Sequence, residues 1–159
     1  MPVYLFTYHA YGSWLPDRRQ GYVKRKRGIL PSDQEEAARY RNAMLEEEVT
    51  LRPEHQRLLL VTLLESQEKQ RFFTHGVATD ATHLHTLVSW ADDRRVVPVR
   101  SRVKSSLSRA MNGEFGKREW LSEGGSRRRV REQTHFDHLL ARYLPKHSGL
   151  VWIEGKGSL

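Results

Sequence analysis

Two strand patterns in the middle of the chain, each preceded or followed by a helical pattern, limit the folds that this sequence can adopt. Residues 72–79 and 83–90 are rich in the β-branched and aromatic residues that favour strands, and Asp80-Ala81 predicts a turn between them. A helical pattern opened by a proline covers residues 53–71, and Pro98 stands at the start of a second one. The apolar residues at helical spacing are Leu59, Leu60, Leu63 and Leu64 in the first pattern, and Val99, Val103, Leu107 and Met111 in the second.

The outer segments complete an alternating order of elements. Residues 3–9 predict a first strand, and residues 118–121 and 127–131 predict two short strands joined at Gly124-Gly125. A last helix is expected over 135–144. The order strand, helix, strand, strand, helix, strand, followed by a closing helix, is the split βαβ pattern of a ferredoxin-like α+β fold. We therefore expect a single domain over 1–159, with an antiparallel sheet, helices on one face and the other face open to a ligand.

The remaining segments predict little regular structure. We expect a long loop to about Leu30, a short acidic helix across the 30s and 40s that Ser32 or Asp33 could cap, and a short apolar tail at 151–153.

The charge of the chain points to a polyanionic partner. The formal net charge is +8 and the sequence pI is about 10.0, which suits a polyphosphate backbone or an anionic surface. No run approaches the roughly 18 apolar residues of a membrane span, and the first residues lack a signal-peptide pattern. The absence of cysteine excludes disulfides and thiolate metal sites. We expect a cytoplasmic, nucleoid-associated protein.

Two histidines on one strand form a candidate metal-binding pair. Side chains alternate along a strand, so His83 and His85 project from one face while Leu84 points to the core. Two imidazoles placed in this way can bind one divalent ion, which takes its further ligands from elsewhere. The alternative is a pair of ordinary strand histidines. The residues after His85 do not match the metallo-β-lactamase pattern, and the zinc-protease pattern is absent, so neither class of hydrolase is favoured.

The last predicted helix carries a candidate nucleophile. A tyrosine phenol beside a metal-bound phosphate can attack it, and Tyr143 would share a helix face with His147, a candidate third ligand. Pro145 lies between them, and its ring would clash with the carbonyl of Ala141 in a regular helix, which could turn His147 away. His138 is then the reserve ligand. The alternative is that Tyr143 only packs its ring on the core.

Together these segments resemble the HUH single-tyrosine transposases, and most closely the REP-associated tyrosine transposases and their insertion-sequence relatives. The resemblance rests on a basic chain of this size, the His-hydrophobic-His strand at 83–85 and the tyrosine of the C-terminal helix, and it extends to residues 8–16 and to Gly149-Leu150-Val151. In that family the residue four after the tyrosine is usually Asn or Gln; His147 replaces it here.

The resemblance implies an HUH endonuclease, acting in DNA transposition and recombination, with the ferredoxin-like fold. It implies dependence on Mg²⁺ or Mn²⁺, held by His83, His85 and His147, and cleavage of single-stranded DNA near a hairpin by Tyr143. The products would be a 5′-phosphotyrosine and a free 3′-OH. A homodimer is possible, in which the tyrosine helix serves either its own histidine pair or that of its partner.

Three basic stretches are expected to neutralise DNA phosphates, and aromatic residues beside them to stack on unpaired bases. The candidate DNA-binding residues are Arg25, Lys26, Arg27, Arg100, Lys104, Arg127, Arg128 and Trp14. Tyr22 and Trp120 are further stacking candidates, with core packing as the alternative for each aromatic. His9 would lie near the site if its strand neighbours that of His83. The rival hypotheses are a hairpin DNA- or RNA-binding module without chemistry and a phosphodiesterase that uses water.

Overall fold

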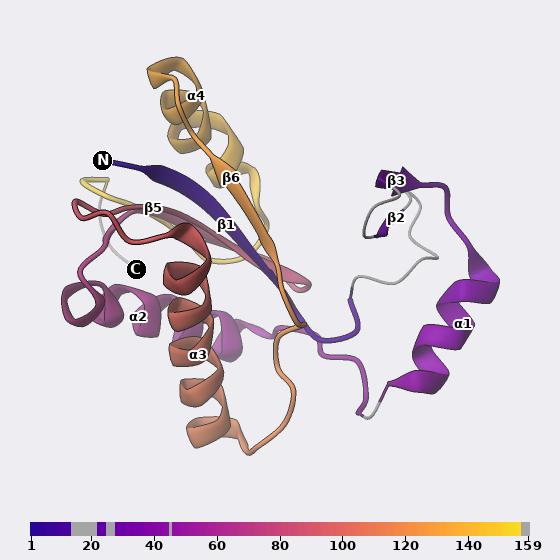
Figure 1. Ribbon diagram of the computed structural model, residues 1–159. Helices are drawn as coiled ribbons and strands as arrows, with labels where there is room; N and C mark the ends of the chain where they lie inside the picture. The colour runs from indigo at the N-terminus through magenta and orange to yellow at the C-terminus, as the bar shows by residue number, and fades with distance from the viewer. Residues whose placement is uncertain (14–21, 25–27, 45, 157–159) are drawn as a thin grey trace.

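The computed structural model describes residues 1–13, 22–24, 28–44 and 46–156. Its centre is a five-stranded antiparallel sheet in the order β6-β1-β5-β4-β7 (Figure 1). The strands are β1 (Val3–His9), β4 (Phe73–Thr79), β5 (His83–Ser89), β6 (Ser126–Arg129) and β7 (Val151–Ile153).

Two helices, α2 (Pro53–Gln70) and α3 (Val96–Phe115), cover one face of this sheet (Figure 1). Their apolar sides meet the sheet in a core that includes Phe6, Leu60 and Leu107, all fully buried. Helix α2 connects β1 to β4, and α3 connects β5 to β6. The antiparallel order β6-β1-β5-β4 with both helices on one face confirms the predicted ferredoxin-like α+β fold.

The C-terminal segment covers part of the opposite face, which the sequence pattern predicted to be open. It consists of α4 (Gln133–His138), a π-helical turn η1 (Leu139–Tyr143) and a 3₁₀ turn η2 (Leu144–Lys146). Leu139 and Leu144 are buried there against Leu5, Ala78 and Leu87 of the sheet. The sheet therefore has an apolar core on both faces, and the candidate tyrosine is carried by the smaller of the two layers.

Among the outer elements, the predicted acidic helix is confirmed, and two segments form strands that were not predicted. The backbone of the expected loop contains a two-stranded pairing of β2 (Tyr22–Lys24) with β3 (Gly28–Leu30). The expected acidic helix is present as α1 (Gln34–Ala43), and Asp33, one of the two candidate caps, accepts the Glu36 N–H through its carboxylate at 2.9 Å. The apolar tail is β7, which pairs with β4 because that strand would otherwise leave its outer edge unpaired.

The expected strand at 118–121 is wrong. Leu121 makes only an isolated bridge to Ala10, and the carbonyl of Trp120 accepts the N–H of Tyr11 at 2.9 Å. Because β1 ends at His9, no continuing strand is available to extend this pairing. Among the helices that the structure describes, none is long and apolar enough to cross a membrane.

The segment after η2 is held on the sheet by backbone contacts at Gly149. Its N–H donates to the carbonyl of Thr79 at 3.0 Å, and the Thr79 N–H donates to Leu150 at 2.8 Å. The side chain of Gln56, buried on α2, accepts the Leu150 N–H at 3.3 Å. A methyl group at Gly149 would collide with the oxygens of Thr79 and Gln56, so the close approach requires glycine.

We therefore expect Gly149→Ala to lower the free energy of unfolding by about 1–3 kcal/mol, the usual cost of overpacking a tight site. Gly113→Ala is the control, since Gly113 lies in α3 with nothing within 4 Å of the added methyl. Alanine there should raise stability by roughly 0.5–1 kcal/mol. Urea unfolding of both variants measures the two effects. Equal stability of Gly149→Ala and the unmodified protein would contradict the tight docking of this segment.

Candidate functional site

Strand β5 presents the two predicted histidines on one face. His83 is half-buried, His85 is 6% exposed, and both face the layer formed by the C-terminal segment. Leu84 between them is fully buried in the core on the α2 and α3 side. The alternation expected from the strand pattern is therefore present.

Strand β1 lies directly beside this pair. In the antiparallel register His9 is opposite His83, and Thr7 is opposite His85. The rings of His9 and His83 have centroids 6.1 Å apart. The sequence predicted that His9 would lie near the site if its strand paired with the strand of His83, and the two strands do pair. Thr7, which the sequence did not single out, takes the place beside the more buried histidine.

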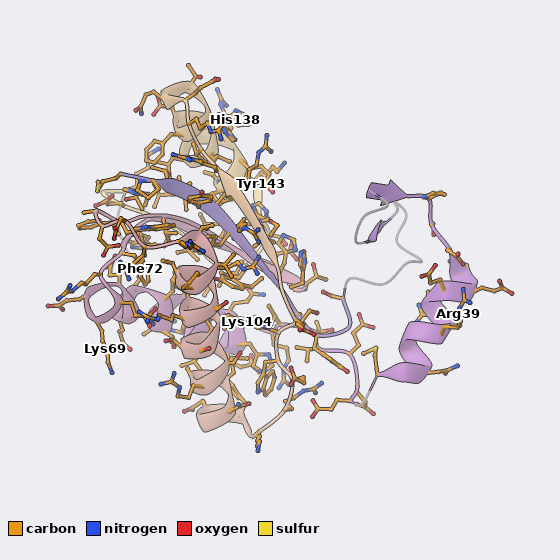
Figure 2. All side chains as sticks on the ribbon, in the orientation of Figure 1. Arg39, Lys69, Phe72, Lys104, His138 and Tyr143 are labelled. Carbon is orange, nitrogen blue, oxygen red and sulfur yellow. The ribbon has the colours of Figure 1, made fainter. Side chains whose placement is uncertain are left out.

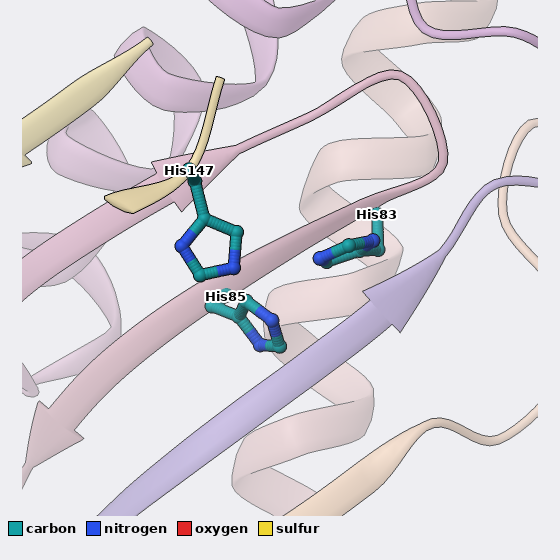
Figure 3. Close-up of side chains that lie close together, drawn as sticks. All are labelled: His83, His85 and His147. Atoms are coloured by element: carbon teal, nitrogen blue, oxygen red, sulfur yellow. The ribbon is translucent and has the colours of Figure 1, made fainter. Parts of the chain in front are cut away.

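The third predicted ligand joins the pair from a distant part of the chain. Figure 3 shows His147, at the end of the C-terminal helical segment, approaching His83 and His85 on β5. One ring nitrogen of each residue lies within 4.8 Å of those of the other two. The ring of His147 is centred 4.8 Å from that of His85 and 5.5 Å from that of His83. These three are the histidine cluster of the site.

Pro145 breaks the regular helix, yet His147 still reaches the cluster. The chain widens into the π-helical turn η1, in which the Leu144 N–H donates to Leu139, and then tightens into the 3₁₀ turn η2. A proline is tolerated near the start of such a turn, where its missing N–H leaves no bond unmade. His147 then adopts an extended backbone, and its N–H donates to the Leu144 carbonyl at 3.3 Å. The change from a π-helical turn to a 3₁₀ turn thus accommodates Pro145 without turning His147 away from the cluster.

The Nδ1 atom of each imidazole has a hydrogen-bond partner. The His147 Nδ1 donates to the Leu144 carbonyl at 3.1 Å, because a carbonyl only accepts. The Thr82 hydroxyl lies 2.9 Å from the His83 Nδ1 and 3.3 Å from the Asp80 carboxylate. Since that hydroxyl donates to the carboxylate, it accepts from His83.

The His85 Nδ1 lies 2.7 Å from the Thr7 Oγ1, and its Nε2 lies 3.2 Å from the Tyr143 hydroxyl. A phenol that donates to Nε2 requires the lone pair on Nε2 and the hydrogen on Nδ1, which then donates to Thr7. A hydrogen on Nδ1 leaves the lone pair of a neutral imidazole on Nε2, the atom that then binds a metal. Three histidines in this tautomer form a donor set that fits a divalent cation.

Burial also favours the neutral form of the His85 imidazole. Desolvation, with repulsion from His83, His147, His9 and Lys146, lowers the pKa of His85 to about 3. The ring is therefore neutral at physiological pH, which is the state that a metal ligand requires.

Tyr143 lies against the histidine cluster. Its Oη is 3.2 Å from the His85 Nε2, and its ring is 5.2 Å from that of His147, centroid to centroid. Burial raises the pKa of Tyr143, and the charge of Arg128 opposes that rise. The phenol is thus protonated at neutral pH. The ammonium of Lys146 lies 4.6 Å from the centroid of the tyrosine ring, a cation–π contact. One chain supplies the tyrosine and all three histidines.

Two of the predicted DNA-binding arginines lie on the edge strand β6. Arg127 and Arg128 are exposed there, and Arg128 is opposite Leu5 on β1. Because Leu5 and Thr7 share a face, Arg128 belongs to the face that carries Tyr143. Arg127 is opposite Phe6 and belongs to the other face.

The other predicted DNA-binding residues do not lie on the face of the sheet that carries Tyr143, or lie outside the described residues. The Arg100 guanidinium donates to the Gly125 carbonyl at 2.6 Å, so it supports the turn into β6. Lys104 is half-buried one turn further along α3, and burial lowers its pKa while Glu119 and Glu123 oppose the shift. Trp120 is buried in the core. Arg25, Lys26, Arg27 and Trp14 lie outside the described residues.

Sequence reasoning missed Thr7 and Lys146. Thr7 lies two residues before His9, so it faces the same side, and the pairing of β1 with β5 would have revealed it. Lys146 carries no signal in the sequence, because its contact depends on the 3₁₀ turn. His138, the reserve ligand, is exposed on α4 and lies outside the histidine cluster (Figure 2).

Comparison with known proteins leaves the family open. No protein-family model matches the sequence, and no curated protein does. Among solved structures, one of a REP-associated tyrosine transposase bound to a REP hairpin is similar at a TM-score of 0.48 and 10% sequence identity. The similarity covers 86% of this chain and 61% of that chain, so this protein spans less than two thirds of that one. The function must therefore be argued from the site.

If the histidine cluster binds a metal, a divalent cation should stabilise the protein. We expect Mn²⁺ at a hundredfold excess over its Kd to raise the free energy of unfolding by about 2.7 kcal/mol. The midpoint of thermal unfolding should rise accordingly. His147→Ala should remove most of this rise, whereas His138→Ala, an exposed histidine outside the cluster, should keep it. An unchanged rise in His147→Ala would show that the third ligand is misassigned.

Proposed function

We propose that this protein is a metal-dependent tyrosine endonuclease and strand transferase, transposase-like, that nicks single-stranded, hairpin-containing DNA. The observation that carries the proposal is the contact between the Tyr143 Oη and the His85 Nε2 at 3.2 Å, beside two further histidines. A phenol in this position adjoins the nitrogens that would hold a cation. The single-stranded substrate rests on the sequence resemblance and is supported by the basic edge strand beside the site.

The proposed reaction transfers a phosphoryl group from the DNA to the protein. The Tyr143 oxygen forms a bond to phosphorus while the bond from phosphorus to the 3′ oxygen breaks. Tyr143 loses its proton, and the departing 3′ oxygen gains one. The products are a 5′-phosphotyrosine and a free 3′-OH, and because the phosphoester bond is conserved, a second 3′-OH can later displace the tyrosine.

His83, His85 and His147 are the proposed metal ligands, each through Nε2. A cation bound there supplies Lewis acidity, which polarises the phosphodiester and offsets its charge. Of the two ions implied by the resemblance, we favour Mn²⁺, since Mg²⁺ prefers oxygen ligands and imidazole nitrogen suits transition metals. The Tyr143 hydroxyl lies at hydrogen-bond distance from the His85 Nε2, so the nucleophile adjoins an atom that would hold the cation.

The surrounding charges have separate roles. Arg128 shares the tyrosine face and opposes the burial that keeps the phenol protonated, so it favours the anionic form that attacks phosphorus. It is also the proposed phosphate contact nearest to the nucleophile. Arg127, Arg100 and Lys104 lie toward the other face and would contact a more distant part of the strand.

A non-catalytic hairpin-binding module of the same fold is the alternative. It is favoured by the exposed arginines of β6, which could grip a backbone without any chemistry. A phosphodiesterase that uses water would need the histidines but not Tyr143. Whether Tyr143 becomes covalently linked to DNA distinguishes the tyrosine endonuclease from these two alternatives.

We expect hairpin-tailed single-stranded DNA and Mn²⁺ to give a covalent protein–DNA adduct that survives a denaturing gel. Tyr143→Phe should abolish the adduct while leaving DNA affinity nearly unchanged, because only the attacking oxygen is removed. Tyr11→Phe, a half-buried tyrosine in the loop after β1, is the matched control. Binding without any adduct supports the module, and cleavage that persists in Tyr143→Phe supports attack by water.

The hydrogen bond between His85 and Thr7 predicts a second, indirect effect on metal binding. Thr7→Val should weaken Mn²⁺ affinity by about 10–100-fold, because the Nδ1 hydrogen of His85 loses its acceptor. Thr86→Val is a close control: Thr86 is buried next in sequence to His85, and its hydroxyl has no partner within the described structure. Isothermal titration with Mn²⁺ compares the two. Equal affinities would rule out a positioning role for Thr7.

A further inference from the structure

A basic groove is formed by α2, α3 and the loop before α3. These two helices lie on the face of the sheet opposite the C-terminal helical segment that carries Tyr143 (Figure 1). The volume of the groove is about 780 Å³, and both helices and the β5–α3 loop line it. The groove side of α3 repeats Arg102, Ser105, Ser106 and Arg109, a spacing that places all four on one helix face. Lys69 of α2 (labelled in Figure 2) contributes to the opposite wall.

The lining of the groove carries more positive than negative charge. Lys69, Arg71, Arg102 and Arg109 are exposed, and none of them enters an ion pair with another described residue. Glu65 is the one acidic residue of the lining outside the Arg94–Asp92 pair. The lining holds five basic residues (Lys69, Arg71, Arg94, Arg102 and Arg109) and two acidic ones (Glu65 and Asp92), so positive charge is in excess there. An anion in the groove would reduce the repulsion among these cations.

The walls of the groove are held in place by hydrogen bonds. The Gln70 amide donates to the Ser106 hydroxyl at 2.6 Å and links α2 to α3. Arg94 donates to the carbonyls of Gln70 and Arg71 at 2.7 and 2.5 Å, and to Asp92 at 2.6 Å. Arg94 thus binds the carboxyl end of α2, and the Gln70–Ser106 contact holds α2 and α3 together as the two walls of the groove.

We propose that this groove binds the phosphate backbone of the nucleic-acid segment that flanks the strand at Tyr143. This inference rests on the proposed function for the identity of the polyanion. The sheet separates the groove from the histidine cluster, so one stretch of strand cannot occupy both. The hydroxyls and cations along α3 offer contacts to successive phosphates and none of the apolar pocket that a base would need.

The test is a salt titration of DNA binding with a charge-reversed groove. Arg102→Glu with Arg109→Glu is compared with Arg57→Glu with Lys117→Glu, which makes the same change in net charge at exposed positions outside the groove. Each pair is made in the unmodified protein and in Tyr143→Phe. Fluorescence anisotropy reports affinity for a labelled DNA hairpin with an unpaired tail, for its paired stem alone and for its tail alone. Thermal unfolding checks that each variant is folded.

We expect the groove pair to make the slope of log affinity against log salt shallower by about two, roughly one for each phosphate that the protein no longer neutralises. The control pair should change it much less. The probe whose affinity falls, stem or tail, identifies the segment held. An equal fall in affinity for the two pairs would mean that only net charge matters, which overturns the proposal, as would no fall in either.

The readouts also separate this inference from the proposed function. Adduct formation on an isolated short tail should survive in the groove pair, because the tyrosine face is untouched. If the unmodified protein forms no adduct, the proposed chemistry fails, while the anisotropy of the Tyr143→Phe proteins still decides whether the groove binds DNA.

Discussion

The packing of the C-terminal segment on the sheet is the interaction on which the candidate site depends. Leu139 and Leu144 bury their side chains against Leu87 and its neighbours, each contributing roughly 1.5–3 kcal/mol. Gly76, at the β-bulge of β4, allows Leu140 and Leu144 to come close to the strand. This apolar packing is what holds Tyr143 next to His83 and His85. The chemistry of the site is thus a by-product of hydrophobic packing between elements far apart in sequence.

Burial also sets the protonation state of the groups brought together. The same desolvation that lowers the pKa of His85 raises that of Tyr143, so the buried imidazole is neutral and the phenol keeps its proton. Each imidazole then has its Nδ1 engaged by an oxygen: Thr7 and Thr82 supply hydroxyls, and Leu144 supplies a carbonyl. These oxygens come from β1, the turn before β5 and η2. The orientation of the donor set is therefore shared among three parts of the chain.

The sheet divides the molecule into two surfaces with different uses. One face holds the histidine cluster, Tyr143 and Arg128, where a few side chains are fixed at hydrogen-bond distance. The other is covered by α2 and α3, which form a groove lined by exposed cations and are joined by a hydrogen bond between Gln70 and Ser106. The first arrangement suits a reaction at one phosphate, and the second suits contact with several phosphates at low specificity. A nucleic acid bound to both would have to pass around an edge of the sheet.

The sequence alone determined the ferredoxin-like order of elements and the shared face of His83 and His85, because the periods of strands and helices are local properties. It also indicated Tyr143 and His147 as partners, although the regular helix assumed for them does not form: η1 and η2 replace it around Pro145. Only the tertiary structure decided that His147 reaches the pair, that Thr7 lies opposite His85 and that β7 joins the sheet. These outcomes depend on register and on packing between segments distant in the chain, which no local pattern encodes. The choice of helix type at Pro145 is likewise a compromise between backbone geometry and the burial of Leu144.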